Sequence, residues 1–185
     1  AEGDTIVAVV GAGHMQGIID FLTDEKASEL DEMETIPPVS LVYKLLGWSI
    51  PLAIIGSITY IGITQGTAAM GDNIMYWVLA NGIPCAVGTL LAFGHPVTIL
   101  VAFLAAPLTS LTPVIGAGYV AAFVQAWAKP PQVAEFQQVS GDLGTFGGWW
   151  RNKLLRVLLV FILSGLGSAL GTYVGAYEIV SNLFK

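Results

Sequence analysis

Long apolar stretches with few polar interruptions dominate the chain. From Leu45 to Ala128 the sole formally charged side chain is Asp72, and another apolar stretch begins at Leu154. A bilayer core takes about 20 mainly apolar residues per helical crossing, and a central Asp, Lys or Arg costs roughly 2.5 to 3.5 kcal/mol there. A stretch that avoids charge over such a length predicts a helical membrane domain.

Helix-breaking residues divide these stretches into three predicted spans and one shorter hairpin. Pro107 and Pro113 interrupt the apolar sequence, and each half beside them is too short for a comfortable crossing. We expect a re-entrant or broken helical hairpin, preceded by a tight turn at Gly94, His95 and Pro96, with Pro96 starting the helix. The predicted spans are about Leu45–Thr64, Ile74–Phe93 with a kink near Pro84, and Leu154–Tyr177, and the hairpin halves are Val97–Ala106 and Val114–Trp127.

Basic residues flanking these segments predict the orientation of the domain. Lys44 and the loop with Lys129, Arg151 and Lys153 belong on the cytoplasmic side by the positive-inside rule. Two spans, a hairpin that returns to its own side and a final span satisfy this rule. A single crossing over residues 97–127 is the less favoured alternative, because it would put the most basic loop outside. We therefore expect an integral protein of the cytoplasmic membrane with a cytoplasmic N-terminal head.

The first residues differ in composition from the rest. Residues 1–36 hold nine of the 13 acidic side chains and one basic one, Lys26, which argues against nucleic-acid binding. Thr5–Val10 predicts a buried strand and Met15–Leu22 a helix, a βα unit too small to bury a core alone. A missing N-terminal segment or another protomer would complete it. The fold class is thus mainly α, with residues 1–23 as a βα unit left over from an α/β domain, 24–42 as an acidic linker and 43–185 as the transmembrane domain.

The turn after the predicted strand has two readings. Gly11, Gly13 and Gly17 form a variant dinucleotide-binding fingerprint, but the acidic residues about 20 positions on, Glu32 and Glu34, lie in the linker with no second strand before them. Alternatively, Gly11-x-x-His14 presents an imidazole that could bind a metal or move protons. One histidine is not a complete metal site, and a structural role for it is common. The remaining ligands would have to come from outside this chain.

Two further groups of residues are candidates within the apolar segments. Intramembrane polar side chains mark functional sites or hydrogen bonds between helices, and His95 is the ionisable one among them. Glycines four residues apart in the last span share one helix face and allow close approach of a neighbour, in the same chain or in another protomer. The polar candidates are His95, Asn81 and Gln125, and the helix-packing candidates are Gly167, Gly171 and Gly175.

Three stretches together carry a family resemblance: VVGAGHMQGI, GHPVTILVAFLAAPLTSLTPVIGAGYVAAFVQAW and RNKLLRVLLVFILSGLGSALGT. The chain resembles the C-terminal half of the TraB/PrgY (pheromone shutdown) family in its archaeal-type form, whose soluble domain is similar to Tiki and GumN-like proteins. The resemblance implies metal-dependent peptidase activity through paired Gly-x-x-His motifs with acidic residues. Gly11 and His14 match the second motif, and the first has no counterpart here.

The resulting hypothesis is that this chain comprises the membrane domain and the closing βα unit of a TraB/PrgY-like protein. In its complete form the protein would bind or degrade a small peptide, with His14 as catalytic residue or ligand of a divalent metal. Whether the chain is an enzyme stays open, because the catalytic unit is incomplete. A transporter or channel built around the broken hairpin and an oligomerising membrane anchor are the alternatives, and the expected partners are the bilayer, a small peptide and a second copy.

Overall fold

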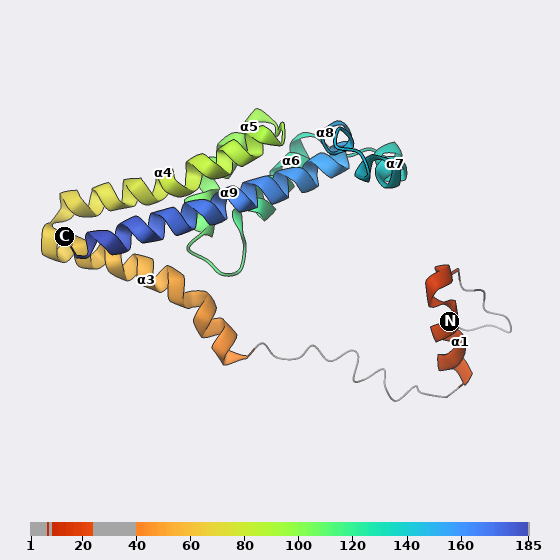
Figure 1. The fold of residues 1–185 in the computed structure, drawn as a ribbon, viewed down its shortest axis with the longest axis horizontal. Helices are drawn as coiled ribbons and strands as arrows, with labels where there is room; N and C mark the ends of the chain where they lie inside the picture. Colours follow the sequence, from red (N-terminus) through yellow and green to blue (C-terminus); the bar gives the residue numbers. More distant parts are fainter. Residues whose placement is uncertain (1–6, 8, 24–39, 185) are drawn as a thin grey trace. The chain divides into compact units, whose positions relative to one another are not determined.

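The chain divides into two compact units, Ala1–Ser40 and Leu41–Lys185. The computed structural model describes residues 7, 9–23 and 40–184. In the first unit a short 3-10 helix, η1 (Ala12–His14), leads into α1 (Met15–Thr23). The second unit contains the long helices and the hairpin (Figure 1).

The strand of the predicted βα unit is not supported. Val7, Val9 and Val10 are exposed and belong to no strand, whereas residues 5, 6 and 8 lie outside the described part of the chain. A strand is held by hydrogen bonds to a neighbouring strand, and the described residues supply none. The helical half of the unit is present as α1. The predicted acidic linker falls largely on residues 24–39, which also lie outside the described residues.

The second unit contains three helices that are long and apolar enough to cross a membrane: α3 (Leu41–Gln65), α4 (Thr67–Leu91) and α9 (Lys153–Asn182). All three correspond to predicted spans. Helices α3 and α9 extend beyond the predicted bounds at both ends, whereas α4 begins before Ile74 and ends before the predicted Phe93. Hydropathy locates the apolar part of a helix, whereas backbone hydrogen bonding continues into polar residues at its ends. The break between α3 and α4 is the single residue Gly66, whose φ of 97° suits a glycine.

Helices α4 and α9 form a closely packed antiparallel pair. Gly88 of α4 lies against Leu163 of α9, and farther along, Gly175 of α9 lies against Trp77 of α4. Helix α3 is more peripheral: of its most apolar 18 residues 11% are buried, compared with 39% in α9. Figure 1 shows α3 diverging from the α4–α9 pair toward its first residues.

The broken hairpin is confirmed as two short helices, α5 (Pro96–Thr109) and α6 (Ala117–Ala128). Pro96 is the first residue of α5, as predicted, and the helix continues through Pro107 to Thr109. At 1.5 Å per residue, these 14 and 12 residues span about 21 and 18 Å. Both lengths fall short of the roughly 30 Å of a bilayer core.

The hairpin begins and ends at the same end of the unit. His95, just before α5, bonds Gln125 near the end of α6, and Trp150, just before α9, bonds Leu91 at the end of α4. The hairpin tip contacts the middle of α9, where Ser110 Oγ lies 3.1 Å from Ser168 Oγ. A hairpin that turns back halfway along the long helices has the geometry of a re-entrant segment.

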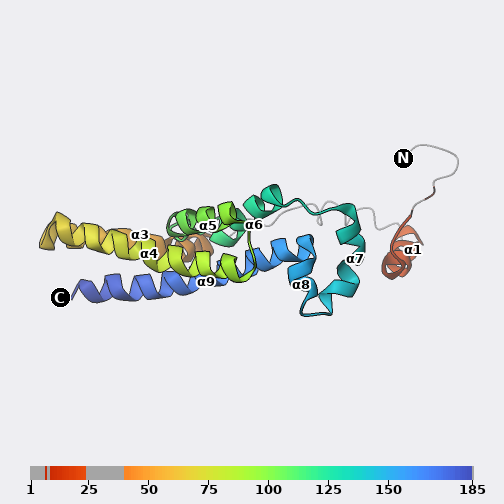
Figure 2. The same ribbon diagram turned by 90° about the horizontal axis from the view of Figure 1, so that it is seen from above.

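Two helices between α6 and α9 were not predicted. They are α7 (Val133–Leu143) and the short α8 (Gly148–Arg151), in the segment that the sequence indicated as a basic loop. Figure 2 shows α7 running crosswise beyond the first residues of α9. The signal for α7 was present as a capping box, in which the Gln132 N–H donates to Glu135 Oε2 at 2.6 Å.

Candidate functional site

His14 lies exposed in η1, and its backbone N–H donates to the Gly11 carbonyl at 2.9 Å. Gly11 is the N-cap of η1 and packs near the imidazole, since a Cβ on it would lie 3.4 Å from His14 Nδ1. In the described part of the chain, no group of three His, Cys, Asp or Glu side chains could hold a metal ion. The role of His14 therefore stays a prediction.

A cluster of uncharged polar side chains joins the hairpin tip to α4 and α9. Asn81 is fully buried, and its Oδ1 accepts hydrogen bonds from Ser110 Oγ and Thr172 Oγ1, each at 2.9 Å. Its Nδ2 donates to the Trp77 carbonyl of the same helix. Ser168 completes the cluster through its contact with Ser110. We call Asn81, Ser110, Ser168 and Thr172 the tip cluster; the sequence indicated Asn81 as a hydrogen-bonding candidate but did not show that Ser110 and Thr172 meet it.

A second polar contact holds the open end of the hairpin. Gln125 of α6 is 1% exposed, and its Oε1 accepts hydrogen bonds from the His95 backbone N–H at 2.8 Å and from Thr98 Oγ1 at 3.0 Å. His95 is the N-cap of α5, where its Nδ1 accepts from the Val97 N–H at 3.3 Å. In this arrangement both His95 and Gln125 position the hairpin.

The three glycines proposed for helix packing face α4. A Cβ at Gly167 would lie 2.2 Å from the Pro84 carbonyl oxygen, and one at Gly171 would lie 2.2 Å from that of Ala80. At Gly175 the nearest atoms belong to the Trp77 ring, at 2.9 Å. This glycine face is occupied by a helix of the same chain, which favours internal packing over a seam between protomers.

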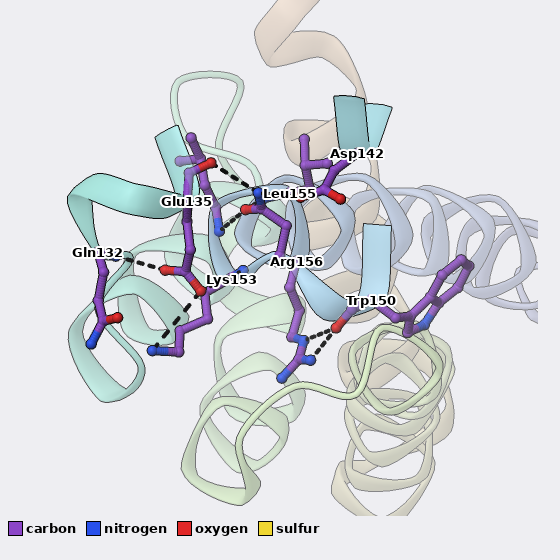
Figure 3. Close-up of polar contacts among 9 residues, drawn as sticks. Gln132, Glu135, Asp142, Trp150, Lys153, Leu155 and Arg156 are labelled. Atoms are coloured by element: carbon purple, nitrogen blue, oxygen red, sulfur yellow. Dashed lines mark hydrogen bonds and ion pairs between the residues drawn. The ribbon is translucent and has the colours of Figure 1, made fainter. Parts of the chain in front are cut away.

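A third set of polar contacts ties α7 to the start of α9, as Figure 3 shows. Glu135 Oε1 accepts a hydrogen bond from the Lys153 backbone N–H at 3.2 Å, and Lys153 Nζ lies 3.9 Å from the same oxygen. Asn152, which is 4% exposed, caps α9 through its Oδ1 and donates from Nδ2 to Asp142 Oδ2 at 2.9 Å. Arg156 donates to the Trp150 carbonyl. Both carboxylates of α7 are thereby turned toward the long helices.

Replacing Gln125 should loosen the hairpin. Gln125→Leu removes the acceptor of two hydrogen bonds, one of them from a backbone N–H, and we expect a loss of about 1 kcal/mol in unfolding free energy. The change in stability is measured by thermal unfolding in detergent. Unfolding is followed through the reaction of the buried Cys85 thiol with a maleimide fluorophore. Gln137→Leu on the exposed face of α7 is the matched control. Equal midpoints for the two variants would contradict the positioning role of Gln125.

Together these features define a helical unit in which three helices, long and apolar enough to cross a membrane, pack with a short hairpin held by uncharged polar contacts. The chain belongs to the TraB family, since residues 42–184 match the C-terminal domain of TraB family proteins. The resemblance that the sequence indicated is thereby confirmed.

An uncharacterized protein of Methanocaldococcus jannaschii is 35% identical over 179 residues, which is 92% of this chain and 45% of the relative. The chain thus spans less than half the length of the curated relative that it matches. No solved structure matches the chain. The archaeal relative is consistent with the archaeal-type form of the family that the sequence stretches resemble.

Proposed function

We propose that this chain is the membrane domain of a TraB-like protein and that it anchors a soluble domain at the cytoplasmic face of the cytoplasmic membrane. The observation that carries the proposal is that three helices of membrane length pack with one another in a single unit, most closely α4 with α9. Among the described residues, every buried side-chain nitrogen or oxygen has a hydrogen-bond partner. The buried polar side chains are Ser, Thr, Asn and Gln, so this interior suits a stable scaffold.

The basic residues support the proposed orientation. Lys129, Arg151, Lys153 and Arg156 all lie at the end of the second unit where α7 and α8 are found. By the positive-inside rule this end is cytoplasmic. Helix α3 starts toward the same end, because its last residue, Gln65, bonds Asn182 at the opposite end. The residues before α3 are then cytoplasmic as well.

The second part of the proposal is that the protein, in its complete form, binds or degrades a small peptide at the cytoplasmic face of the membrane. The family membership and the Gly11-x-x-His14 turn support this part of the proposal. His14 would serve as a catalytic residue or as a ligand of a divalent metal, with the other ligands supplied by residues outside this chain. The exposure of His14 leaves its ring accessible to such ligands.

Replacing His14 tests the peptide-handling part separately from anchoring. In the complete protein, His14→Ala should lower both the content of bound Zn²⁺ or Mn²⁺ and the turnover of a library of short fluorogenic peptides, because the imidazole is lost. Gln16→Ala, on the neighbouring exposed turn of α1, should change neither. Metal content and turnover that survive His14→Ala would refute the site assignment and leave the anchoring role intact.

A transporter is the second candidate, and the tip cluster favours it. Discontinuous helices in transporters often place their breaks near the bilayer midplane, beside the substrate. Here the break between α5 and α6 lies against Asn81 and Ser168. Ion and proton pathways usually need ionisable groups, however, and the tip cluster has none.

Flux measurements separate the anchor from the transporter. We expect proteoliposomes with the complete protein to pass protons, Na⁺ and short peptides no faster than protein-free liposomes, because the interior polar groups are already paired. Proton flux is read with an enclosed pH-sensitive dye, and Na⁺ and peptide flux with radiolabelled solutes. Solute-dependent flux above the protein-free level would replace the anchor with the transporter.

A further inference from the structure

The exposed side of α7 is divided into an apolar strip and a polar strip. Val133, Phe136 and Leu143 are 77%, 58% and 50% exposed. At 100° per residue these positions fall on one side of the helix, with Ser140 among them, whereas Gln137 and Gln138 fall on the neighbouring exposed side together with Ala134. A helix with a packed face, an exposed apolar strip and an exposed polar strip is suited to a boundary between water and an apolar phase.

The charges of this region are arranged unequally. The two acidic side chains of α7, Glu135 and Asp142, bond the start of α9 and its N-cap, as described above. The exposed cations Lys129 and Arg151 stand at either end of the α7–α8 segment. This end of the protein therefore directs its carboxylates inward and carries cations on its surface, which complements an anionic lipid surface.

The position of α7 matches the depth of a membrane interface. It lies crosswise at the point where the apolar part of α9 begins (Figure 2). Trp149 and Trp150 lie beside it, and their indole N–H groups donate to the Leu143 and Leu91 carbonyls. Tryptophan rings and basic side chains are enriched where a protein passes from hydrocarbon to headgroups.

We propose that α7 is an interfacial helix that lies in the cytoplasmic leaflet, with its apolar strip among the acyl-chain ends and Lys129 and Arg151 against anionic lipid phosphates. The inference rests on the proposed membrane crossing of α3, α4 and α9. As a consequence, α7 would fix how deep the start of α9 lies in the membrane. The connection is made by the Glu135–Lys153 and Asp142–Asn152 contacts. The basic end of the domain is thereby held at the membrane surface, where the proposal places the soluble domain.

Single cysteines on neighbouring faces of α7 test the inference, and Cys85 is the one native cysteine within this chain. In the complete protein, Cys85 and every native cysteine outside this chain are replaced by alanine. Bimane is then attached at Phe136→Cys, at Gln137→Cys, and at Leu166→Cys on the exposed side of α9. The proteins are reconstituted in phosphatidylcholine vesicles containing phosphatidylglycerol. Quenching by aqueous iodide and by nitroxide-labelled lipids is then compared.

The expected pattern differs at the three positions. Bimane at 136 should be quenched by nitroxide lipids and shielded from iodide, bimane at 137 should be several-fold more accessible to iodide, and bimane at 166 should behave as membrane-embedded. Equal iodide quenching at 136 and 137 would overturn the inference. Shielding at 136 without lipid quenching would also overturn it, because protein would then cover the strip. Iodide access at 166 would refute the membrane crossing itself.

Discussion

Gly171→Ala in α9 is expected to destabilise the helical unit by about 3 kcal/mol, the upper end of the usual cost of overpacking. The added Cβ would lie 2.2 Å from the Ala80 carbonyl oxygen and 2.7 Å from the Asn81 Cα. Both neighbours are backbone atoms of α4, so no side-chain rotation can relieve the overlap. The two helices would have to separate along their contact.

Gly165→Ala on the same helix provides the matched control. A Cβ at Gly165 meets nothing within 4 Å, and alanine has a better helix propensity than glycine by up to about 1 kcal/mol. We expect unchanged or slightly higher stability. The measurement is the midpoint of thermal unfolding in detergent, followed by the reactivity of the Cys85 thiol. Cys85 reports on the α4–α9 contact because its backbone N would lie 2.9 Å from a Cβ at Gly167. Equal midpoints for the two alanine variants would contradict close α4–α9 packing.

Asn81→Leu is expected to loosen the hairpin tip and to cost about 1 to 3 kcal/mol. Leucine is similar in size but cannot accept the hydrogen bonds from Ser110 and Thr172, which come from two different segments. The tip would lose its polar attachment to α4, while the helix itself keeps its backbone hydrogen bonds. The effect should therefore concentrate in residues 108–116.

Hydrogen–deuterium exchange of that segment in the complete protein measures the loosening. Exchange should rise in Asn81→Leu and stay unchanged in Thr59→Val, whose hydroxyl bonds only the Ile55 carbonyl of its own helix on the exposed side of α3. The midpoint of Cys85 reactivity should fall in parallel. Unchanged exchange in Asn81→Leu would show that apolar contacts alone hold the tip.

Local signals predicted much of the fold. The turn at Gly94, His95 and Pro96 was predictable because proline favours the first turn of a helix and glycine favours the preceding bend. The hairpin was predictable because Pro113 and the short apolar runs leave too few residues for a crossing. Helix α7 was missed because its apolar positions are sparse, and its clearest sign is the capping box at Gln132 and Glu135.

The N-terminal unit shows the opposite outcome. Its β-branched run favours a strand locally, yet Val9 and Val10 belong to none, since a strand depends on a neighbour that the described residues do not supply. The same dependence applies to His14. A histidine in a glycine turn can be recognised in a sequence, whereas a metal site needs ligands that the fold brings together.

By itself the sequence determined the family, the three membrane-length helices and the place of the hairpin, because span length and helix breaks depend on short-range hydropathy and backbone geometry. Only the tertiary structure decided which polar groups meet. Asn81 and Thr172 are joined across 91 positions of the chain, and Ser110 and Ser168 across 58. Such contacts depend on the rotation and depth of each helix, which are set by close packing at glycines such as Gly171 and not by any local signal.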